Sequence, residues 1–304
     1  MESQNDIKRK IQEKIQDKKK RLSKGQRLIL NYIEEHSDKA AFLTAAKLGE
    51  AVGVSESTVV RFAISLGYEG YPKFQKSLQE HVKQKLNSIQ RMEMTSGVLS
   101  DLSESGVLES VLNSDIEKIK TTLETIDKTG FEQAVETILR AETIYIIGIR
   151  SCAPLASFLG FYLNLVLEDV RILQSSNSSE LFEQMLRIGE KDVIIGISFP
   201  RYSMRTLKAL EFAHNRGAQV VTLTDSSNSP MNLYSSCSLL AKSDMASIVD
   251  SLVAPLSVIN ALIAALCMKK QTDVVHTLET LEKIWGEYQI YNKDEISPVE
   301  KKIE

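Results

Sequence analysis

Between residues 144 and 268, short apolar runs alternate with longer helical patterns, and this alternation constrains the fold more than any other feature of the chain. Strands that alternate with helices predict a parallel sheet that is covered on both faces and has right-handed crossovers. We therefore predict a doubly wound, mostly parallel, five-stranded α/β domain. The expected strands are 144–149, 170–174, 193–198, 219–224 and 238–242, and the expected helices are 154–167, 179–188, 204–216 and 248–268.

The carboxyl ends of these strands run into loops that carry many hydroxyl groups. Parallel strands bring such loops to one edge of the sheet, where open α/β sheets bind their ligands. A single serine-rich loop would be weak support for a site, but three loops at corresponding positions are stronger. The candidate ligand-binding residues in these loops are Arg150, Ser151, Ser175, Ser176, Ser198, Arg201, Tyr202, Ser203 and Asp225.

The loops after the first and third strands suggest how an anion would be held. Ser151 lies where a helix is expected to begin, and a hydroxyl beside free backbone N–H groups can bind phosphate. A plain strand-to-helix turn is the alternative. A dinucleotide site is rejected, because the segment GIRSCA lacks the GxGxxG pattern. Arg201 offers a planar donor suited to a carboxylate or phosphate. Tyr202 either stacks on a sugar ring or covers the pocket.

Residues 44–66 have the spacing of a helix-turn-helix. A helix over 45–52 is followed by Gly53, which can adopt the positive φ of a tight turn, and by a second helix over 55–66. Gly49 allows close approach of the two helices, and Val59 fills the core between them. The second helix begins with short polar side chains that can reach bases and phosphates. The candidate DNA-binding residues are Ser55, Glu56, Ser57, Thr58 and Arg61, and the alternative is a helical bundle that binds nothing.

The charge is distributed unevenly along the chain. Residues 1–90 hold 17 lysines and arginines against 11 acidic residues, whereas the remainder holds 20 against 29. A basic N-terminal part suits contact with a polyanion. We divide the chain into a helix-turn-helix domain over 1–90, a linker over 91–114, an α/β domain over 115–290 and a tail over 291–304. Helices are expected at 74–90 and 115–141, and a single apolar stripe lies within residues 1–22.

The remaining composition argues against several classes of protein. The N-terminus is too highly charged for a secretory signal, and the apolar stretch 252–268 is shorter than a membrane span and better explained as a buried helix. Three widely spaced cysteines and four isolated histidines match no metal-binding spacing. We expect a cytoplasmic protein with no membrane segment, metal or cofactor.

Two segments resemble a known family of bacterial regulators. The stretch VGVSESTVVRFAISLGYEGYPKF is similar to the N-terminal domain of the RpiR (MurR/RpiR) family of transcription regulators, and the likeness extends over about residues 5–290. The resemblance implies a winged-type or extended helix-turn-helix, followed by a sugar isomerase (SIS) domain that holds phosphosugars. It also implies phosphate contacts from Ser151, Ser198 and Ser203. The chain departs from the family pattern at 47–49, and in the loop S-x-S-G-x-T, where Pro200, Arg201 and Ser203 replace Ser, Gly and Thr.

From these features we expect a transcription regulator, most simply a repressor, whose operator binding changes when a phosphorylated sugar or sugar acid binds. Its partners would be near-palindromic double-stranded DNA and a second copy of the chain, and a tetramer of two dimers is also open. Helices 115–141 and 248–268 are the candidate dimer interface. The alternatives are an SIS-type isomerase fused to a DNA-binding module and an SIS domain that only dimerises. For the isomerase, Glu180 is the only plausible carboxylate base, because the pocket loops hold no histidine and His214 is expected at a helix end.

Overall fold

The computed structural model describes residues 22–83, 89–90, 92, 102–174, 177–243 and 249–290. All the regular structure in the first of these ranges is helical, so the helix-turn-helix is of the extended kind and has no strand in residues 22–83. Ser23 begins it with a capping box, because its hydroxyl accepts from the Gln26 N–H and the Gln26 side chain accepts in return. The helices are α2 (Lys24–Glu35), α3 (Ser37–Ala40), α4 (Ala45–Val52), α5 (Glu56–Ser65) and α6 (Tyr71–Lys83).

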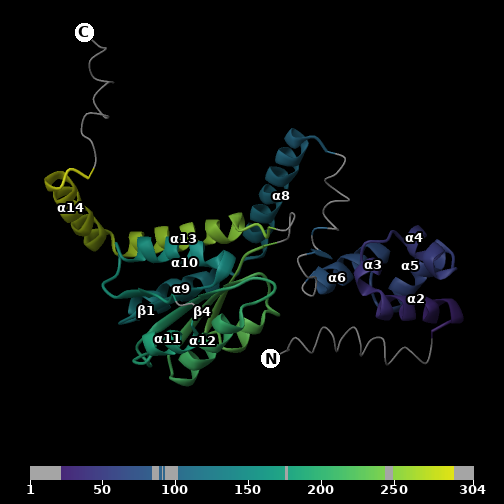
Figure 1. Cartoon of the computed structure of the whole chain (residues 1–304), viewed down its shortest axis with the longest axis horizontal. Coiled ribbons are helices and arrows are strands. Elements are labelled where there is room, and N and C mark those ends of the chain that lie inside the picture. Colours follow the sequence, from purple (N-terminus) through teal and green to yellow (C-terminus); the bar gives the residue numbers. More distant parts are fainter. Residues whose placement is uncertain are drawn as a thin grey trace, which may run out of the picture.

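The second part is a five-stranded sheet whose strands are all parallel and follow the order β2-β1-β3-β4-β5 (Figure 1). This order is that of a doubly wound sheet, because the chain moves first to one side of β1 and then to the other. The predicted α/β fold is therefore confirmed. The strands are β1 (Ile144–Gly148), β2 (Val170–Ile172), β3 (Val193–Ile197), β4 (Gln219–Thr224) and β5 (Cys237–Leu240).

Helices cover both faces of this sheet. One face packs against α9 (Lys128–Arg140), α10 (Ala153–Leu163) and α13 (Val253–Lys269), and the other against α11 (Ser178–Gln184) and α12 (Met204–Asn215). Because successive strand residues point to opposite faces, Ile146 lies in one apolar cluster and Ile147 in the other. The central strands β1 and β3 are buried at every position, as expected when both faces are covered.

Two helix predictions were wrong. The expected helix 115–141 is two helices, because Asp127 caps a new one by accepting from the Thr129 N–H. The first of the two, α8 (Glu104–Thr125), begins inside the expected linker, where Ser103 caps it. Helix α13 begins at Val253 instead of 248, which suits Pro255, since proline is tolerated only in the first turn.

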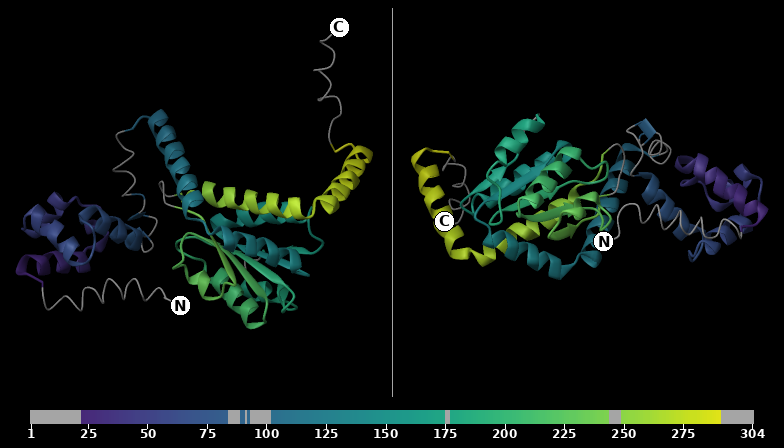
Figure 2. Two further views of the ribbon diagram at one scale, coloured as in Figure 1. Left: turned by 180° about the vertical axis from the view of Figure 1, so that it is seen from behind. Right: turned by 90° about the horizontal axis from the view of Figure 1, so that it is seen from below.

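Helix α14 (Gln271–Glu287), which we did not predict, follows α13 at a bend of 98°. Figure 2 shows α8 and α14 at opposite ends of α13, both projecting away from the sheet. Among the described residues, no single helix is long and apolar enough to cross a membrane, and α13 and α14 meet that measure only when counted together across their bend. The N-terminal stripe within 1–22 and the tail 291–304 lie outside the described residues.

Candidate functional site

The turn between α4 and α5 is built around two glycines. A Cβ on Gly49 would lie 2.6 Å from the Val54 carbonyl oxygen, so only glycine fits where the turn folds back. Gly53 has φ +75°, the left-handed conformation predicted for it. Val59 is fully buried, which agrees with its predicted place in the core. These features hold the start of α5 at a fixed angle to α4.

The polar start of α5 faces solvent. Ser55, Glu56, Ser57 and Arg61 are exposed, and Thr58 is partly exposed. Ser55 occupies the N-cap position but its hydroxyl does not cap the backbone. It bonds the hydroxyls of Ser57 and Thr58 at 3.0 and 2.9 Å. The first-turn N–H groups of α5 therefore lack the Ser55 hydroxyl as an acceptor, which suits contact with a phosphate.

Arg61 lies one turn along α5, and its Nε donates to the Ser57 carbonyl at 3.2 Å. The structure thus brings all five predicted DNA-binding residues onto one helix. Elsewhere in the domain, Tyr71 and Gln75 tie α6 to the segment before α4 by donating to the Leu43 carbonyl at 2.7 and 2.9 Å. Burial raises the pKa of Tyr71 to about 12, so this hydroxyl remains a donor at neutral pH.

The candidate ligand loops meet at the point where the order of the sheet reverses. Strands β1 and β3 are neighbours, and the chain leaves them toward opposite sides of the sheet. The crevice between such strands, beyond their carboxyl ends, is the usual ligand site of a doubly wound sheet. The loop after β1 holds Arg150 and Ser151, both exposed, and the loop after β3 runs from Ser198 to Ser203.

Both loops carry an arginine in a left-handed conformation. Among the described residues only Arg150 (φ +60°), Arg201 (φ +66°) and Gln289 have positive φ without being glycine. Arg201 occupies the position at which the SIS loop pattern has glycine, so the structure explains that glycine by its backbone conformation. A non-glycine residue there costs on the order of 1–2 kcal/mol, and such strain commonly persists where a site needs the side chain.

Hydrogen bonds close the loop after β3 on itself. The buried Ser198 hydroxyl accepts from the Ser203 N–H at 3.2 Å, and the Ser203 hydroxyl caps α12 by accepting from the Thr206 N–H at 3.4 Å. Both predicted phosphate serines therefore lie at the N-terminus of α12. The Thr206 hydroxyl itself is buried and has no hydrogen-bond partner among the described residues. The sequence offered no sign of that unsatisfied group.

Tyr202 and Asp225 connect the loop after β3 to the loop after β4. The Tyr202 hydroxyl donates to Asp225 Oδ1 at 2.7 Å, and Thr224 donates to the same oxygen at 3.2 Å. Burial raises the pKa of Asp225, although these donors oppose the rise, and burial together with the nearby carboxylate raises the pKa of Tyr202. Tyr202 thus braces the site through its hydroxyl group, and both predicted roles of its ring, stacking on a sugar and covering the pocket, stay predictions.

Cys152 connects the loops after β1 and β3. Its thiol interacts with the Phe199 backbone and the Ser151 hydroxyl, and burial raises its pKa to about 11. The loops after β1, β3 and β4 are therefore joined in one unit by Cys152 and Tyr202. Ser175 and Ser176, in the loop after β2, lie outside the described residues. No cluster of residues that could hold a metal occurs in the part of the chain that the structure describes.

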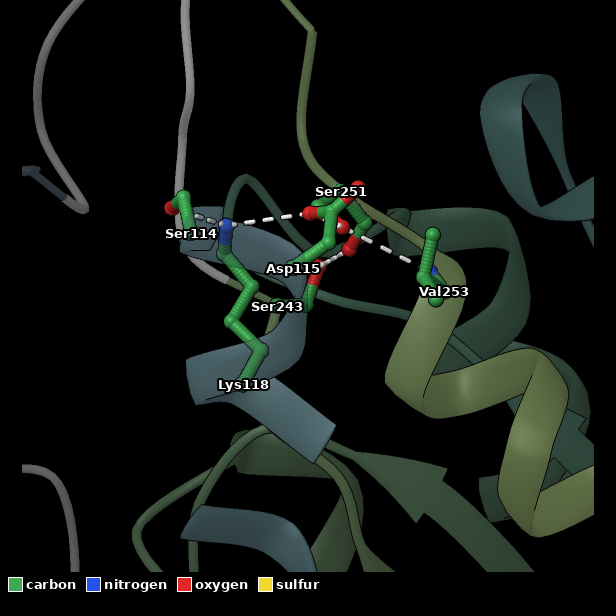
Figure 3. Close-up of polar contacts among 6 residues, drawn as sticks. All are labelled: Ser114, Asp115, Lys118, Ser243, Ser251 and Val253. Carbon is green, nitrogen blue, oxygen red and sulfur yellow. Dashed lines mark hydrogen bonds and ion pairs between the residues drawn. The ribbon is translucent and has the colours of Figure 1, made fainter. Parts of the chain in front are cut away.

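A second polar cluster, absent from our sequence predictions, lies between α8 and the segment that joins β5 to α13 (Figure 3). Asp115 on α8 accepts from the Ser251 hydroxyl at 2.6 Å and from Lys118 at 3.3 Å, and Ser243 donates to the Ser251 carbonyl at 2.9 Å. Thr122, also on α8, accepts from the Lys242 N–H at 2.9 Å. These contacts fasten α8 to the chain just after β5, at the same edge of the sheet as the candidate ligand loops.

Helix α8 is inverted relative to an ordinary surface helix. Its buried residues are polar, Lys118 and Thr122, and Lys118 is only 5% exposed. Its large apolar side chains face outward instead. These are Leu108, Leu112, Ile116, Ile119 and Leu123. Exposed apolar side chains that gather on one side of a helix are typical of an interaction surface.

Comparisons with known proteins match both parts of the chain. The helix-turn-helix domain of the rpiR family matches residues 9–85, and the SIS domain matches residues 137–265. The sugar isomerase domain of an RpiR transcription factor from Sphaerobacter thermophilus is 30% identical, with a TM-score of 0.55, over 57% of this chain and 96% of that one.

Two further relatives extend over more of the chain. The transcriptional regulator HexR of Escherichia coli is 25% identical over 221 residues, which cover 70% of this chain and 71% of HexR. The Vibrio vulnificus NanR protein, solved with ManNAc-6P, is 20% identical with a TM-score of 0.54 over 90% of this chain and 98% of NanR. At that identity the likeness to NanR concerns the fold alone.

Proposed function

We infer the function of this chain from its family, since it belongs to the RpiR family of transcription regulators, with an rpiR-type helix-turn-helix ahead of an SIS domain. We propose that it represses transcription, and that a phosphorylated sugar or sugar acid bound at the switch point of the sheet changes its affinity for DNA. The observation that carries the ligand proposal is the pair of left-handed arginines, Arg150 and Arg201, on the two loops that flank this point.

The proposed ligand contacts come from three loops. Ser151, Ser198 and Ser203 would hold the phosphate at helix N-termini, as the family resemblance implies. The guanidinium groups of Arg150 and Arg201 would bind a second anionic group or the phosphate itself. That NanR was solved with a phosphorylated sugar supports this class of ligand. Ser175 and Ser176 are included as proposed ligand contacts on the basis of the sequence alone.

An isomerase fits the structure less well. Sugar-phosphate isomerases need a general base beside the reacting carbon. His214 lies near the end of α12, whereas the candidate loops lie at its beginning, so His214 is at the opposite edge of the sheet. Glu180 lies in the first turn of α11, where a carboxylate stabilises the helix. We therefore propose a binding domain without catalysis, which matches the naming of HexR as a regulator.

We propose that the protein binds a near-palindromic operator as a dimer in the cytoplasm. The candidate interface consists of the outward apolar face of α8 together with α13, in place of the single helix 115–141 and the helix 248–268 that the sequence suggested. Two copies would place their α5 helices about one DNA turn, roughly 34 Å, apart. SIS-mediated dimerisation without any ligand is the alternative that the left-handed arginines disfavour.

The function is tested by titrating the full chain against its own upstream DNA at several salt concentrations. Phosphate contacts release counterions, so the affinity should fall steeply as salt rises, and an affinity independent of salt would refute the contact model. The ligand site is tested by a thermal-shift screen of sugar phosphates on the wild type and on Ser151→Ala. A stabilisation that Ser151→Ala retains in full would refute the site.

A further inference from the structure

Helix α14 has no residue buried within its own chain. None of its 17 residues falls in a buried position, although α8, which also projects from the body, buries two. The helix turns away from α13 by 98°, and in Figures 1 and 2 it stands clear of the sheet. An isolated helix of this length is only marginally stable in water, so α14 needs a surface to pack against.

The sequence of α14 indicates what kind of surface covers it. Its apolar side chains recur at spacings of four, three, four and three residues, which is the repeat of a coiled-coil seam. The residues are Val274, Leu278, Leu281 and Trp285, followed by Tyr288 directly after the end of the helix. Val274, the first of them, also packs against the apolar core of its own chain, so the free part of the stripe begins at Leu278. A strict repeat of this kind fits a facing helix with the same repeat. The stripe covers about two heptads, and the same helix of a second copy would present a matching stripe.

We propose that α14 packs against a second copy of this chain, as an arm of the dimer interface. The proposal rests on the dimer in the proposed function. The charges permit such pairing: within the helix, Val275, Thr277, Glu282 and Ile284 lie beside the seam, so only one of these four is charged. The other acidic side chains of the helix, such as Asp273, Glu279 and Glu287, lie farther from the seam. Two copies would therefore meet without rows of like charge.

The surface of α13 continues the same interface. Residues 253–268 contain no charged side chain, and Met268, at the end nearest α14, is 79% exposed. A helix that is apolar on all sides is normally buried, so the outer side of α13 also requires a cover. A stable interface buries about 800 Å² and 20–30 residues on each partner. The five seam residues are too few alone, but they extend the area that α13 and α8 offer.

The full chain provides its own probe, because Trp285 is its only tryptophan. During dilution of the full chain we would measure two quantities, the mass by light scattering and the wavelength of the Trp285 fluorescence emission. The wild type should have twice the 34.0 kDa mass of one chain. On dilution its tryptophan emission should shift to the red as the mass falls. The double variant Leu278→Glu/Leu281→Glu should dissociate at a concentration at least tenfold higher, which corresponds to about 1.4 kcal/mol.

His276→Glu is the matched control, since it adds a carboxylate on the side of α14 opposite the seam and should leave the dissociation constant unchanged. Thermal unfolding of the double variant and of the control should stay close to that of the wild type at concentrations where each is monomeric, because the substituted side chains are exposed or partly exposed within the chain. An unchanged dissociation constant and emission in the double variant would overturn the proposal. Blue-shifted Trp285 emission from a protein with the mass of one chain would also overturn it, because it would mean that α14 is covered by its own chain.

The proposed function can fail independently of this inference. If the double variant dissociates and the wild type binds none of its upstream DNA, the arm stands and the regulator proposal falls. If the double variant stays dimeric and still binds that DNA, the arm falls and the regulator proposal stands.

Discussion

Replacing Arg201 with glycine separates the two roles that its conformation suggests. At φ +66° the arginine backbone is strained by on the order of 1–2 kcal/mol, and glycine removes that strain. Glycine also adds about 0.5–1 kcal/mol of conformational freedom to the unfolded chain. The difference predicts that Arg201→Gly raises the free energy of unfolding by about 0.5 kcal/mol. For a domain of this size that is a rise of about 1–2 °C in Tm.

The matched control is Lys208→Gly. Lys208 is exposed in the interior of α12, where glycine should lower the free energy of unfolding by about 1 kcal/mol. The two substitutions therefore carry opposite signs in one domain, and denaturant unfolding followed by circular dichroism measures both. If Arg201→Gly destabilises the protein as much as Lys208→Gly does, the loop is not strained in the way the backbone angle indicates.

Ligand binding gives the second reading of Arg201→Gly. Loss of the guanidinium should weaken a sugar-acid phosphate, such as 6-phosphogluconate, more than the matching neutral sugar phosphate, glucose 6-phosphate. Glycine is a better probe than alanine because alanine would keep the strained backbone. Equal losses for both compounds in a thermal-shift titration would reduce Arg201 to a second phosphate contact. The predicted rise in the free energy of unfolding of unliganded Arg201→Gly does not depend on which of these results is found.

Three further substitutions test other parts of the structure. Thr206→Val removes a buried hydroxyl without a partner while keeping the shape, so unfolding should cost about 1 kcal/mol more, and a loss of stability would mean that the hydroxyl is satisfied. Gly49→Ala would place a Cβ 2.6 Å from the Val54 carbonyl and should abolish DNA binding by distorting the turn, with at least about 1 kcal/mol lost in unfolding experiments on the full chain. Burial raises the pKa of Asp225 in the folded protein, so its contribution to stability is greatest below about pH 4, the unfolded value, and is lost as pH rises through the folded value. The free energy of unfolding of Asp225→Asn should therefore rise relative to that of the wild type over this interval, as measured by unfolding at a series of pH values.

The sequence predicted most of the regular structure because its signals are local. The five strands were found within about two residues of their ends, since each is a short apolar run bounded by polar loops. Capping by Ser23 and Thr44 and the positive φ of Gly53 also follow from neighbouring residues. The positions of the candidate loops at one edge follow from the parallel order of the strands, which alternation with helices implies.

What the sequence did not predict depends on residues that are far apart or on weak patterns. The bond between Asp115 and Ser251 joins positions 136 residues apart, and nothing in either segment indicates it. Helix α8 begins in a stretch rich in serine, glutamate and glycine, whose composition suggested a linker. The left-handed backbone at Arg201 was not predicted, because arginine itself gives no sign of it; the glycine that the SIS loop pattern has at this position was the one available signal.

The polar contacts of α8 decide where the chain can be divided. A fragment that begins at residue 137, where the SIS match begins, would lose Asp115 and Thr122, and so leave the Ser251 hydroxyl and the Lys242 N–H without their acceptors. These two groups lie near the two ends of the connection from β5 to α13, at the same edge of the sheet as the candidate ligand loops. A fragment prepared to measure ligand affinity should therefore begin no later than Ser103, the cap of α8. A shorter one would report on a site whose edge has been loosened by the cut.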